Sequence, residues 1–212
     1  MRGRDIKRYA YEFADVWLIN THNGVKEKGI KPINIDDYPA IKKHLDRFYS
    51  ELEKRLDKGI TPYNLRNCAY IEDFYRQKIV WAELARTGNA FIYDNSKSIV
   101  LNTSYILTSN NGGVQKLKYL LSILNSKLIL FYMDLISSKL DKTGWRWLKQ
   151  FVEQLPIPNY ETENETISYL VNRVIDNKKN NIPVNEYEKQ IDEIIYQMFK
   201  LDCEEIKFIE MR

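Results

Sequence analysis

The sequence predicts an α+β fold, in which a β-rich region is flanked by helices and followed by an antiparallel pair of helices. Two observations carry this prediction. Between residues 60 and 107, short runs of aromatic and β-branched residues alternate with turn residues, a pattern typical of strands. Before and after this region, apolar residues recur at intervals of three and four, which places them on one face of a helix.

The first 58 residues contain one expected strand and one expected helix. Residues 16–19 (VWLI) are strand-like and end at a turn of sequence HNG. Residues 38–58 form an amphipathic pattern that Asp36 or Asp37 can cap and Gly59 can end. Charges of both signs cover its polar face, which favours a solvated surface helix. Its apolar face carries Ile41, Leu45, Phe48, Leu52 and Leu56.

Residues 60–107 are expected to supply most of the strands. Residues 78–81 (KIVW) are one strand candidate, and residues 105–107 (YIL) are another. Residues 89–93 and 99–101 flank a turn of sequence DNS, and this arrangement predicts a hairpin.

The stretch of residues 119–158 organises the rest of the chain. Two apolar runs separated by residues 125–126 (NS) predict two buried helices. A basic and aromatic loop follows. The stretch ends as extended backbone at residues 155–158 (LPIP), because two prolines cannot continue a helix. The loop is one place to expect a polyanionic partner. The alternative is that Trp145 and Trp147 anchor the core and the basic residues form a solvated rim.

After Pro158, a polar linker leads to two further amphipathic patterns, which predict the antiparallel helix pair. The first opens with a possible capping box, Thr162 with Glu165, and the second runs from about residue 186 to 201. Asp202, with Glu205 three residues on, can cap a last short helix. The pair could pack on the rest of the chain or on another protein.

The composition excludes several classes of protein. No apolar run reaches the roughly 18 to 20 residues that a membrane span needs, and the N-terminus has no apolar stretch typical of a secretory signal. The two cysteines, Cys68 and Cys203, stand without a Cys/His cluster and indicate neither a disulfide framework nor a zinc site. A reducing cytoplasm is the simplest location.

The net charge of +3 hides an asymmetry along the chain. Residues 1–150 contain 25 Lys and Arg against 16 Asp and Glu, whereas residues 151–212 contain 7 against 13. A basic body with an acidic tail favours a polyanionic partner for the body, although both can be ordinary soluble surfaces. The start of the chain could contact phosphate, or it could be a frayed terminus or a cut end. Its cations are Arg2, Arg4, Lys7 and Arg8.

The sequence shows no catalytic motif. The two histidines, His22 and His44, accompany no nucleophile motif, and no Gly-rich phosphate loop follows a strand. Glu72 and Asp73 near Lys78 suggest a metal-dependent nuclease at first sight, but the usual strand-borne acidic residue followed by Glu-x-Lys is missing. We therefore expect no catalysis by this chain alone.

A set of short segments stands in an order and spacing that is specific, although no single segment is. They are residues 3–9 (GRDIKRY), 63–66 (YNLR), 78–81 (KIVW), 102–105 (NTSY), 124–126 (LNS), 144–151 (GWRWLKQF) running to 155–158 (LPIP), and 191–196 (IDEIIY) with Leu201 and Glu205-Ile206. Over nearly the whole chain this order resembles the C-terminal target-recognition region of the TaqI/Eco57I-like type IIG restriction-modification enzymes. These enzymes are adenine-specific DNA methyltransferases, often fused to a nuclease.

The resemblance implies a DNA-reading module, related in plan to the specificity subunits of type I systems. Residues 1–158 would be the target-recognition domain and residues 159–212 a C-terminal helical segment. In such enzymes a separate upstream domain binds S-adenosylmethionine and flips the target adenine through an Asn-Pro-Pro-Tyr motif, which this sequence lacks. S-adenosylmethionine and Mg²⁺ would belong to missing catalytic domains. The chain would itself need no cofactor and resembles a fragment or a split-off module.

The partners implied are double-stranded DNA and a methyltransferase or nuclease domain in cis or in trans, with no membrane. Basic side chains would hold phosphates, while Arg, Lys, Asn or Gln on loops would read base edges in the major groove. The residues expected to contact DNA are Arg66, Arg76, Arg86, Asn89, Lys139, Lys142, Arg146 and Lys149. Further candidates for base reading are Asn110 and Asn111.

Two other functions remain open at this point. The chain could be a helical protein-interaction or scaffold module of such a system, in which case its basic body is incidental; the same alternative includes a protein like a type I specificity subunit. It could also be a degenerate nuclease. The first alternative predicts binding that barely responds to salt, because helix docking releases few counterions.

Overall fold

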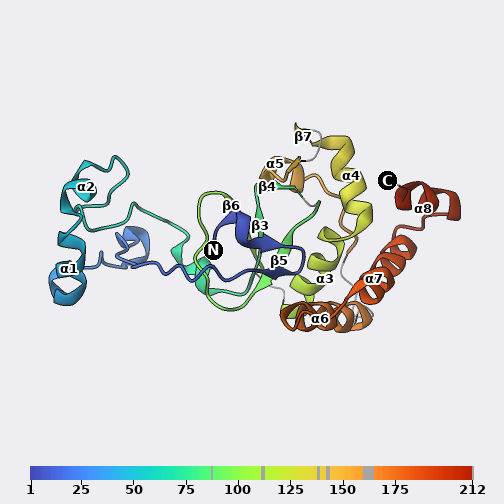
Figure 1. The fold of residues 1–212 in the computed structure, drawn as a ribbon, viewed down its shortest axis with the longest axis horizontal. Helices are drawn as coiled ribbons and strands as arrows, with labels where there is room; N and C mark the ends of the chain where they lie inside the picture. The colour runs from blue at the N-terminus through green and yellow to red at the C-terminus, as the bar shows by residue number, and fades with distance from the viewer. Residues whose placement is uncertain (87, 111–112, 138, 142–143, 160–164, 212) are drawn as a thin grey trace. The chain divides into compact units, whose positions relative to one another are not determined.

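The computed structural model describes residues 1–86, 88–110, 113–137, 139–141, 144–159 and 165–211. By packing, the chain forms two compact units (Figure 1). The core unit comprises residues 1–16 and 73–212, and the inserted unit comprises residues 17–72. The helices that follow residue 158 thus pack in the same unit as the strands that precede it. The domain boundary expected at residue 158 stays a prediction about the extent of the recognition domain.

A three-stranded antiparallel sheet forms the centre of the core unit. Its order is β5 (Phe91–Asp94), β3 (Lys78–Ala82), β6 (Ser104–Thr108). All five residues of β3 are buried, because strands flank it on both sides and other elements cover it. The strands expected at residues 78–81 and 105–107 are confirmed.

The expected hairpin between residues 89–93 and 99–101 is wrong. β5 pairs with β3 instead, and residues 99–101 bond to the start of the chain. The Met1 ammonium donates to the Ile99 carbonyl at 2.7 Å, and the Leu101 amide donates to the Met1 carbonyl at 3.0 Å. The N-terminus therefore takes the hydrogen bonds that a hairpin partner would have made.

A second antiparallel sheet has the order β4 (Leu84–Ala85), β8 (Gly144–Arg146), β7 (Lys139–Asp141). The chain passes from the first sheet to the second at Glu83. The Glu83 amide donates to the Thr103 carbonyl at 3.0 Å, and its carbonyl accepts from the Trp147 amide at 2.8 Å. Part of the basic and aromatic loop is thus strand. Trp147 is 1% exposed, so it anchors the core.

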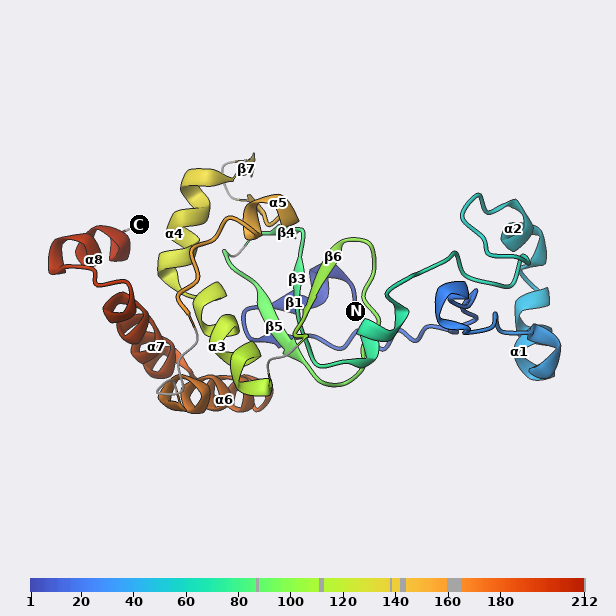
Figure 2. The same cartoon turned by 180° about the vertical axis from the view of Figure 1, so that it is seen from behind.

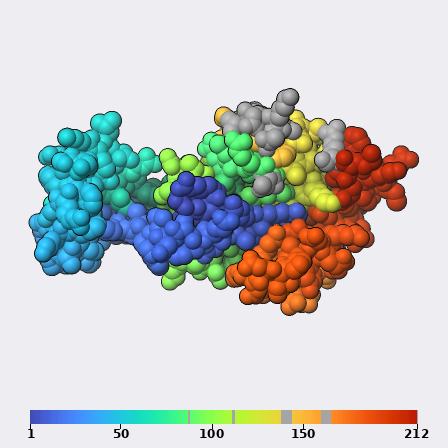
Figure 3. All heavy atoms as spheres, viewed as in Figure 1, coloured from blue at the N-terminus to red at the C-terminus, as the bar shows by residue number. Residues whose placement is uncertain are grey.

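The first eleven residues lie against the central sheet. The short 3-10 helix η1 (Gly3–Asp5) leads into a hairpin of β1 (Ile6–Lys7) and β2 (Ala10–Tyr11), which contacts β5. Figure 3 shows this dark-blue segment on the surface, beside the green strand region and the orange C-terminal helices. The basic start of the chain is therefore built into the core unit.

The two predicted apolar helices are confirmed. They are α3 (Val114–Leu124) and α4 (Lys127–Ile136), and they break at Asn125-Ser126 as expected. α3 packs on β5 and β3. Among the described residues no single helix is long and apolar enough to cross a membrane, although α3 and α4, bent by 62°, meet that test as a pair.

Four further helices complete the core unit (Figure 2). They are α5 (Lys149–Val152), α6 (Glu165–Lys179), α7 (Asn185–Met198) and α8 (Cys203–Glu210). α6 packs on α3 and α7, while α4 contacts α7 and α8. The expected cap of α8 is confirmed, since Asp202 accepts from the amides of Glu204 and Glu205 at 2.9 Å. Thr162, expected to cap α6, lies outside the described residues.

The inserted unit is built of short helices with little core. It contains η2 (Lys26–Lys28), η3 (Ile35–Asp37), α1 (Pro39–Asp46) and α2 (Tyr49–Lys54), and η4 (Ile71–Tyr75) follows where the chain returns to the core unit. The single helix expected over residues 38–58 is thus two helices, and neither buries a residue. Residues 16–19 form no strand, and Trp17 among them is 79% exposed. An apolar run is stabilised as a strand only when its backbone pairs with the edge of a sheet, and residues 16–19 pair with none.

The turn between α3 and α4 is joined to strand β5 by side-chain amides. Asn125 accepts from the Phe91 amide at 3.2 Å and donates to the Phe91 carbonyl at 2.9 Å. Asn89 donates to the carbonyls of Leu124 and Ser126 at 3.1 and 2.8 Å. All of these groups are buried, where an unpaired polar group is costly.

Replacing Asn125→Ala should lower the free energy of unfolding by roughly 1 to 3 kcal/mol, because it leaves the buried Phe91 amide of β5 without the acceptor that Asn125 supplies. Urea denaturation measures the change. Asn180→Ala, which removes an exposed amide donating to the Asp176 carbonyl, is the control and should stay within about 0.5 kcal/mol of the parent. Equal effects for the two variants would contradict the role given to Asn125.

A buried carboxylate ties α7 to the start of α4. Asp192 is 3% exposed and accepts from the Lys127 amide at 3.0 Å. Burial raises the pKa of Asp192 to about 6, partly opposed by that hydrogen bond and by the charges of Arg8 and Lys127. Its protonated form therefore favours folding below the ordinary pKa of an aspartate, and that contribution is lost as pH rises through about 6.

Asp192→Asn should consequently stabilise the protein at pH 7.5 relative to the parent and have little effect near pH 4. The asparagine oxygen can still accept from Lys127, and no charge is buried. Urea midpoints measured across this pH range test the prediction. Asp176→Asn, at an exposed position of α6, should give no such trend. A difference between Asp192→Asn and the parent that is independent of pH would refute it.

Candidate nucleic-acid interface

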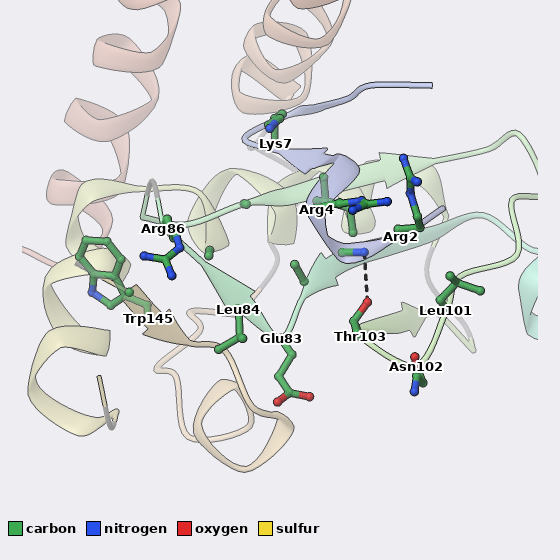
Figure 4. Close-up of a pocket in the computed structure, with 16 residues that line it drawn as sticks. Arg2, Arg4, Lys7, Glu83, Leu84, Arg86, Leu101, Asn102, Thr103 and Trp145 are labelled. Atoms are coloured by element: carbon green, nitrogen blue, oxygen red, sulfur yellow. Dashed lines mark hydrogen bonds between the residues drawn. The ribbon is translucent and has the colours of Figure 1, made fainter. Parts of the chain in front are cut away.

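A pocket of about 640 Å³ opens in the core unit where the N-terminal segment meets the two sheets (Figure 4). Its walls come from η1 and β1, from the passage between β3 and β4, from residues 101–103 and from β8. Among the described residues that line it, one side chain is acidic, Glu83. Four are basic: Arg2, Arg4, Lys7 and Arg86.

The fold of the first turn fixes the position of the N-terminal cations. Asp5 holds Arg2 through a contact of 2.8 Å between the guanidinium Nη2 and the carboxylate, and it also accepts from the Arg2 amide at 3.0 Å. The hydrogen bond from the Arg2 side chain is the main reason that the pKa of Asp5 is lowered. Arg4, the next cation, is exposed and makes no salt bridge with another described residue.

The close approach of the N-terminal segment to the loop before β6 depends on Gly3. Its amide donates to Thr103 Oγ1 at 3.2 Å, the contact drawn in Figure 4. A Cβ atom at Gly3 would lie 2.8 Å from the Thr103 carbonyl oxygen. A larger residue would therefore push Arg2 and Arg4 away from the pocket.

The floor of the pocket is apolar. Ile6, Ala82, Ala85 and Ala90 line it and are buried. Trp145 of β8 is half-buried, and its indole Nε1 donates to Asp134 of α4, which fixes the ring. The site thus combines an apolar base with a cationic rim.

Several of the sequence-predicted residues gather around the second sheet. Arg86 follows β4 and lines the pocket. Arg146 lies in β8 opposite Leu84, and Lys139 lies in β7 opposite Trp145 in the backbone register. Lys149, the first residue of α5, is exposed and contacts Glu153 at 3.3 Å.

Other predicted residues that the structure describes neither line the pocket nor belong to the second sheet. Arg76 is exposed but contacts Asp73 at 3.1 Å and donates to the Ser109 carbonyl. Arg66 is exposed in the inserted unit, and Asn110 is exposed before α3. Lys142 and Asn111 lie outside the described residues.

Asn89 requires a correction. We expected it on a loop that reads bases, but it is 3% exposed and donates both of its amide contacts to backbone carbonyls in the core. The Gly and Asn residues around it suggested a surface turn. In the structure the polar side chain is instead needed to satisfy the carbonyls at the break between α3 and α4.

The sequence singled out the basic start but did not place Arg2, Arg4 and Lys7 in the site. The density of cations in the first eight residues was the available signal. The sequence did not identify the residues that this segment packs against, because residues 2–7 reach the pocket only through long-range contacts with Thr103 and β5. No group of three His, Cys, Asp or Glu side chains suited to a metal ion occurs among the described residues.

Gly3→Ala should destabilise the core unit by roughly 1 to 3 kcal/mol, because the added methyl group overpacks a contact with backbone. Urea denaturation measures this. Gly113→Ala is the matched control, since an added Cβ there meets only the end of the Gln115 side chain, at 3.3 Å. Wild-type stability in Gly3→Ala would show that the N-terminal turn is not held where the structure places it.

The sequence also matches the model of a known protein family. Residues 1–157 match the family model described as the TaqI-like C-terminal specificity domain. The match covers both units up to the exit from α5, and helices α6 to α8 lie beyond it. Because the matched region is well over half of the chain, the protein belongs to the family of TaqI-like C-terminal specificity domains.

Proposed function

We propose that this chain is a sequence-specific DNA-recognition module of a restriction-modification enzyme, and that the chemistry belongs to a methyltransferase or nuclease domain in cis or in trans. The observation that carries the proposal is the basic face of the core unit. Arg2, Arg4, Lys7 and Arg86 line one pocket there, within the residues that match the specificity family.

This face suits a phosphate backbone for two reasons. Its cations come from segments about 80 residues apart in the chain, which the sheet holds together. Arginine also presents several donors in a rigid plane that matches a phosphate group. Phosphate contacts would fix the register of the module on the duplex, while neighbouring side chains read base edges.

Specificity would come from polar side chains beside the cations. Asn102 and Thr103 line the pocket. Arg146 lies on β8 opposite the lining residue Leu84, and Lys149 is the first residue of α5. Side chains of these types pair with base edges in the major groove. The C-terminal helices α6 to α8, which carry most of the acidic excess, would serve as scaffold or as a contact for the catalytic domain.

The purified chain should bind random-sequence duplex DNA, and its affinity should fall steeply as salt rises, because each phosphate contact releases counterions. The double variant Arg4→Ala/Arg86→Ala should weaken binding and reduce the slope of log affinity against log salt by about 2. Fluorescence anisotropy with a labelled duplex at several salt concentrations measures both quantities.

The matched control is Arg173→Ala/Lys207→Ala, which removes the same charge from exposed positions on α6 and α8. It should leave the slope unchanged. An affinity that ignores salt, or an equal loss in both double variants, would refute the proposed face and favour a protein-docking module instead.

A further inference from the structure

The pocket described above has a feature that binding a phosphate backbone does not require. Backbone phosphates need cations at the surface of the protein. Beneath the cations, however, this pocket extends to an apolar floor, and Leu84 and Leu101 at its mouth are each 47% exposed. An apolar hollow in contact with water is unfavourable unless an apolar group fills it.

The combination indicates a ligand with one flat, weakly polar part and one anionic part. Within duplex DNA the bases are stacked and paired, so none of them can enter a hollow in a protein. A nucleotide that has left the stack offers both parts, a base with a π-face and a phosphate on either side of its sugar.

We propose that this pocket accepts one unstacked nucleotide, with its base in the apolar hollow and its flanking phosphates at the cationic rim. The nucleotide would come from the DNA that the module binds, so this inference rests on the proposed function and extends it. A free mononucleotide has the same chemistry and is the alternative source.

The dimensions and the rigidity of the site fit this ligand. Its volume of about 640 Å³ lies within the range of roughly 300 to 1,000 Å³ typical of small-molecule sites. Trp145 offers a ring for stacking and is fixed by its hydrogen bond to Asp134. One cation of the rim is also held in place, because Asp5 binds Arg2.

Two polar side chains of the lining offer hydrogen-bonding groups to such a base, and one of them, Glu83, also bonds Tyr105. Figure 4 shows Glu83 and Asn102 projecting on the same side of the strands, at the part of the pocket formed by residues 82–86 and 101–103. A carboxylate accepts from amino groups, and an amide both donates and accepts. The pocket can therefore distinguish bases by their hydrogen-bonding edges.

The test compares three duplexes of one sequence at one low salt concentration: fully paired, with a single-nucleotide bulge, and with the same bulge lacking its base. Leaving the stack costs little for an unpaired nucleotide. The chain should bind the bulged duplex at least tenfold more tightly than the paired one by fluorescence anisotropy. The abasic bulge should lose that gain, which separates the base from mere flexibility of the backbone.

Two variants locate the effect in the pocket. Leu84→Trp fills the hollow from an exposed position and should abolish the preference for the bulge, so that the bulged and the paired duplex bind this variant with equal affinity. Trp145→Ala removes the stacking surface and should weaken binding of the bulged duplex roughly 5- to 150-fold, and Trp145→Phe should restore part of it. Trp17→Ala, an exposed tryptophan in the inserted unit, is the control. Thermal unfolding confirms that each variant is folded.

The outcomes separate this inference from the proposed function. Salt-sensitive binding of the paired duplex with no gain for the bulge overturns the pocket assignment and leaves DNA recognition standing. A gain that survives Leu84→Trp also overturns it. If no duplex binds, the proposed function fails, and titration with dAMP then decides the pocket alone: saturable binding lost in Leu84→Trp supports the nucleotide site, and no binding overturns it.

Discussion

The amide of Asn125 is the contact on which the rest of the core unit depends. It donates to and accepts from Phe91 at the edge of β5 that faces away from β3, so a side chain does what a neighbouring strand would do. Because β5 is the outer strand of its sheet, this pairing satisfies backbone groups at an edge that has no neighbouring strand in the sheet. It also docks the turn between α3 and α4 onto the sheet.

Other parts of the core unit converge on the same strand. The Tyr9 amide donates to the same Phe91 carbonyl at 3.0 Å and brings the N-terminal hairpin against β5. The Phe91 ring packs edge-on against Trp147, with ring centres 5.0 Å apart, and Trp147 donates to the Gly88 carbonyl at 3.2 Å. The arrangement of the basic face therefore depends on β5, although β5 supplies none of the basic residues.

A buried ion pair supports the same region from the other end of the strand. Lys78 of β3 lies 2.6 Å from Asp94 of β5, and both side chains are almost fully buried. Burial alone would raise the pKa of Asp94, but hydrogen bonds from Lys78 and Ser96 outweigh it and lower the pKa. Lys78, which stands near Glu72 and Asp73 in the sequence, is thus a structural partner of Asp94. The turn after Asp94 leads to the residues that bond Met1.

Local patterns were sufficient where an element buries a continuous apolar face. The two apolar runs separated at residues 125–126 predicted α3 and α4 correctly, and Asp202 with Glu205 predicted the start of α8. The patterns failed for residues 99–101 and 16–19. Strand pairing is decided by whichever segment reaches the edge, and periodicity within a strand does not identify its partner.

The sequence by itself determined the α+β class, the helices α3, α4, α6, α7 and α8, the order of motifs that marks the specificity family, and the excess of positive charge in residues 1–150. Only the tertiary structure decided which of those charges lie together. Arg4 and Arg86 line one pocket because Gly3 admits the N-terminal turn against Thr103 and because Glu83 carries the chain from one sheet to the next. Contacts between residues so distant in the chain depend on packing, and no local pattern encodes them.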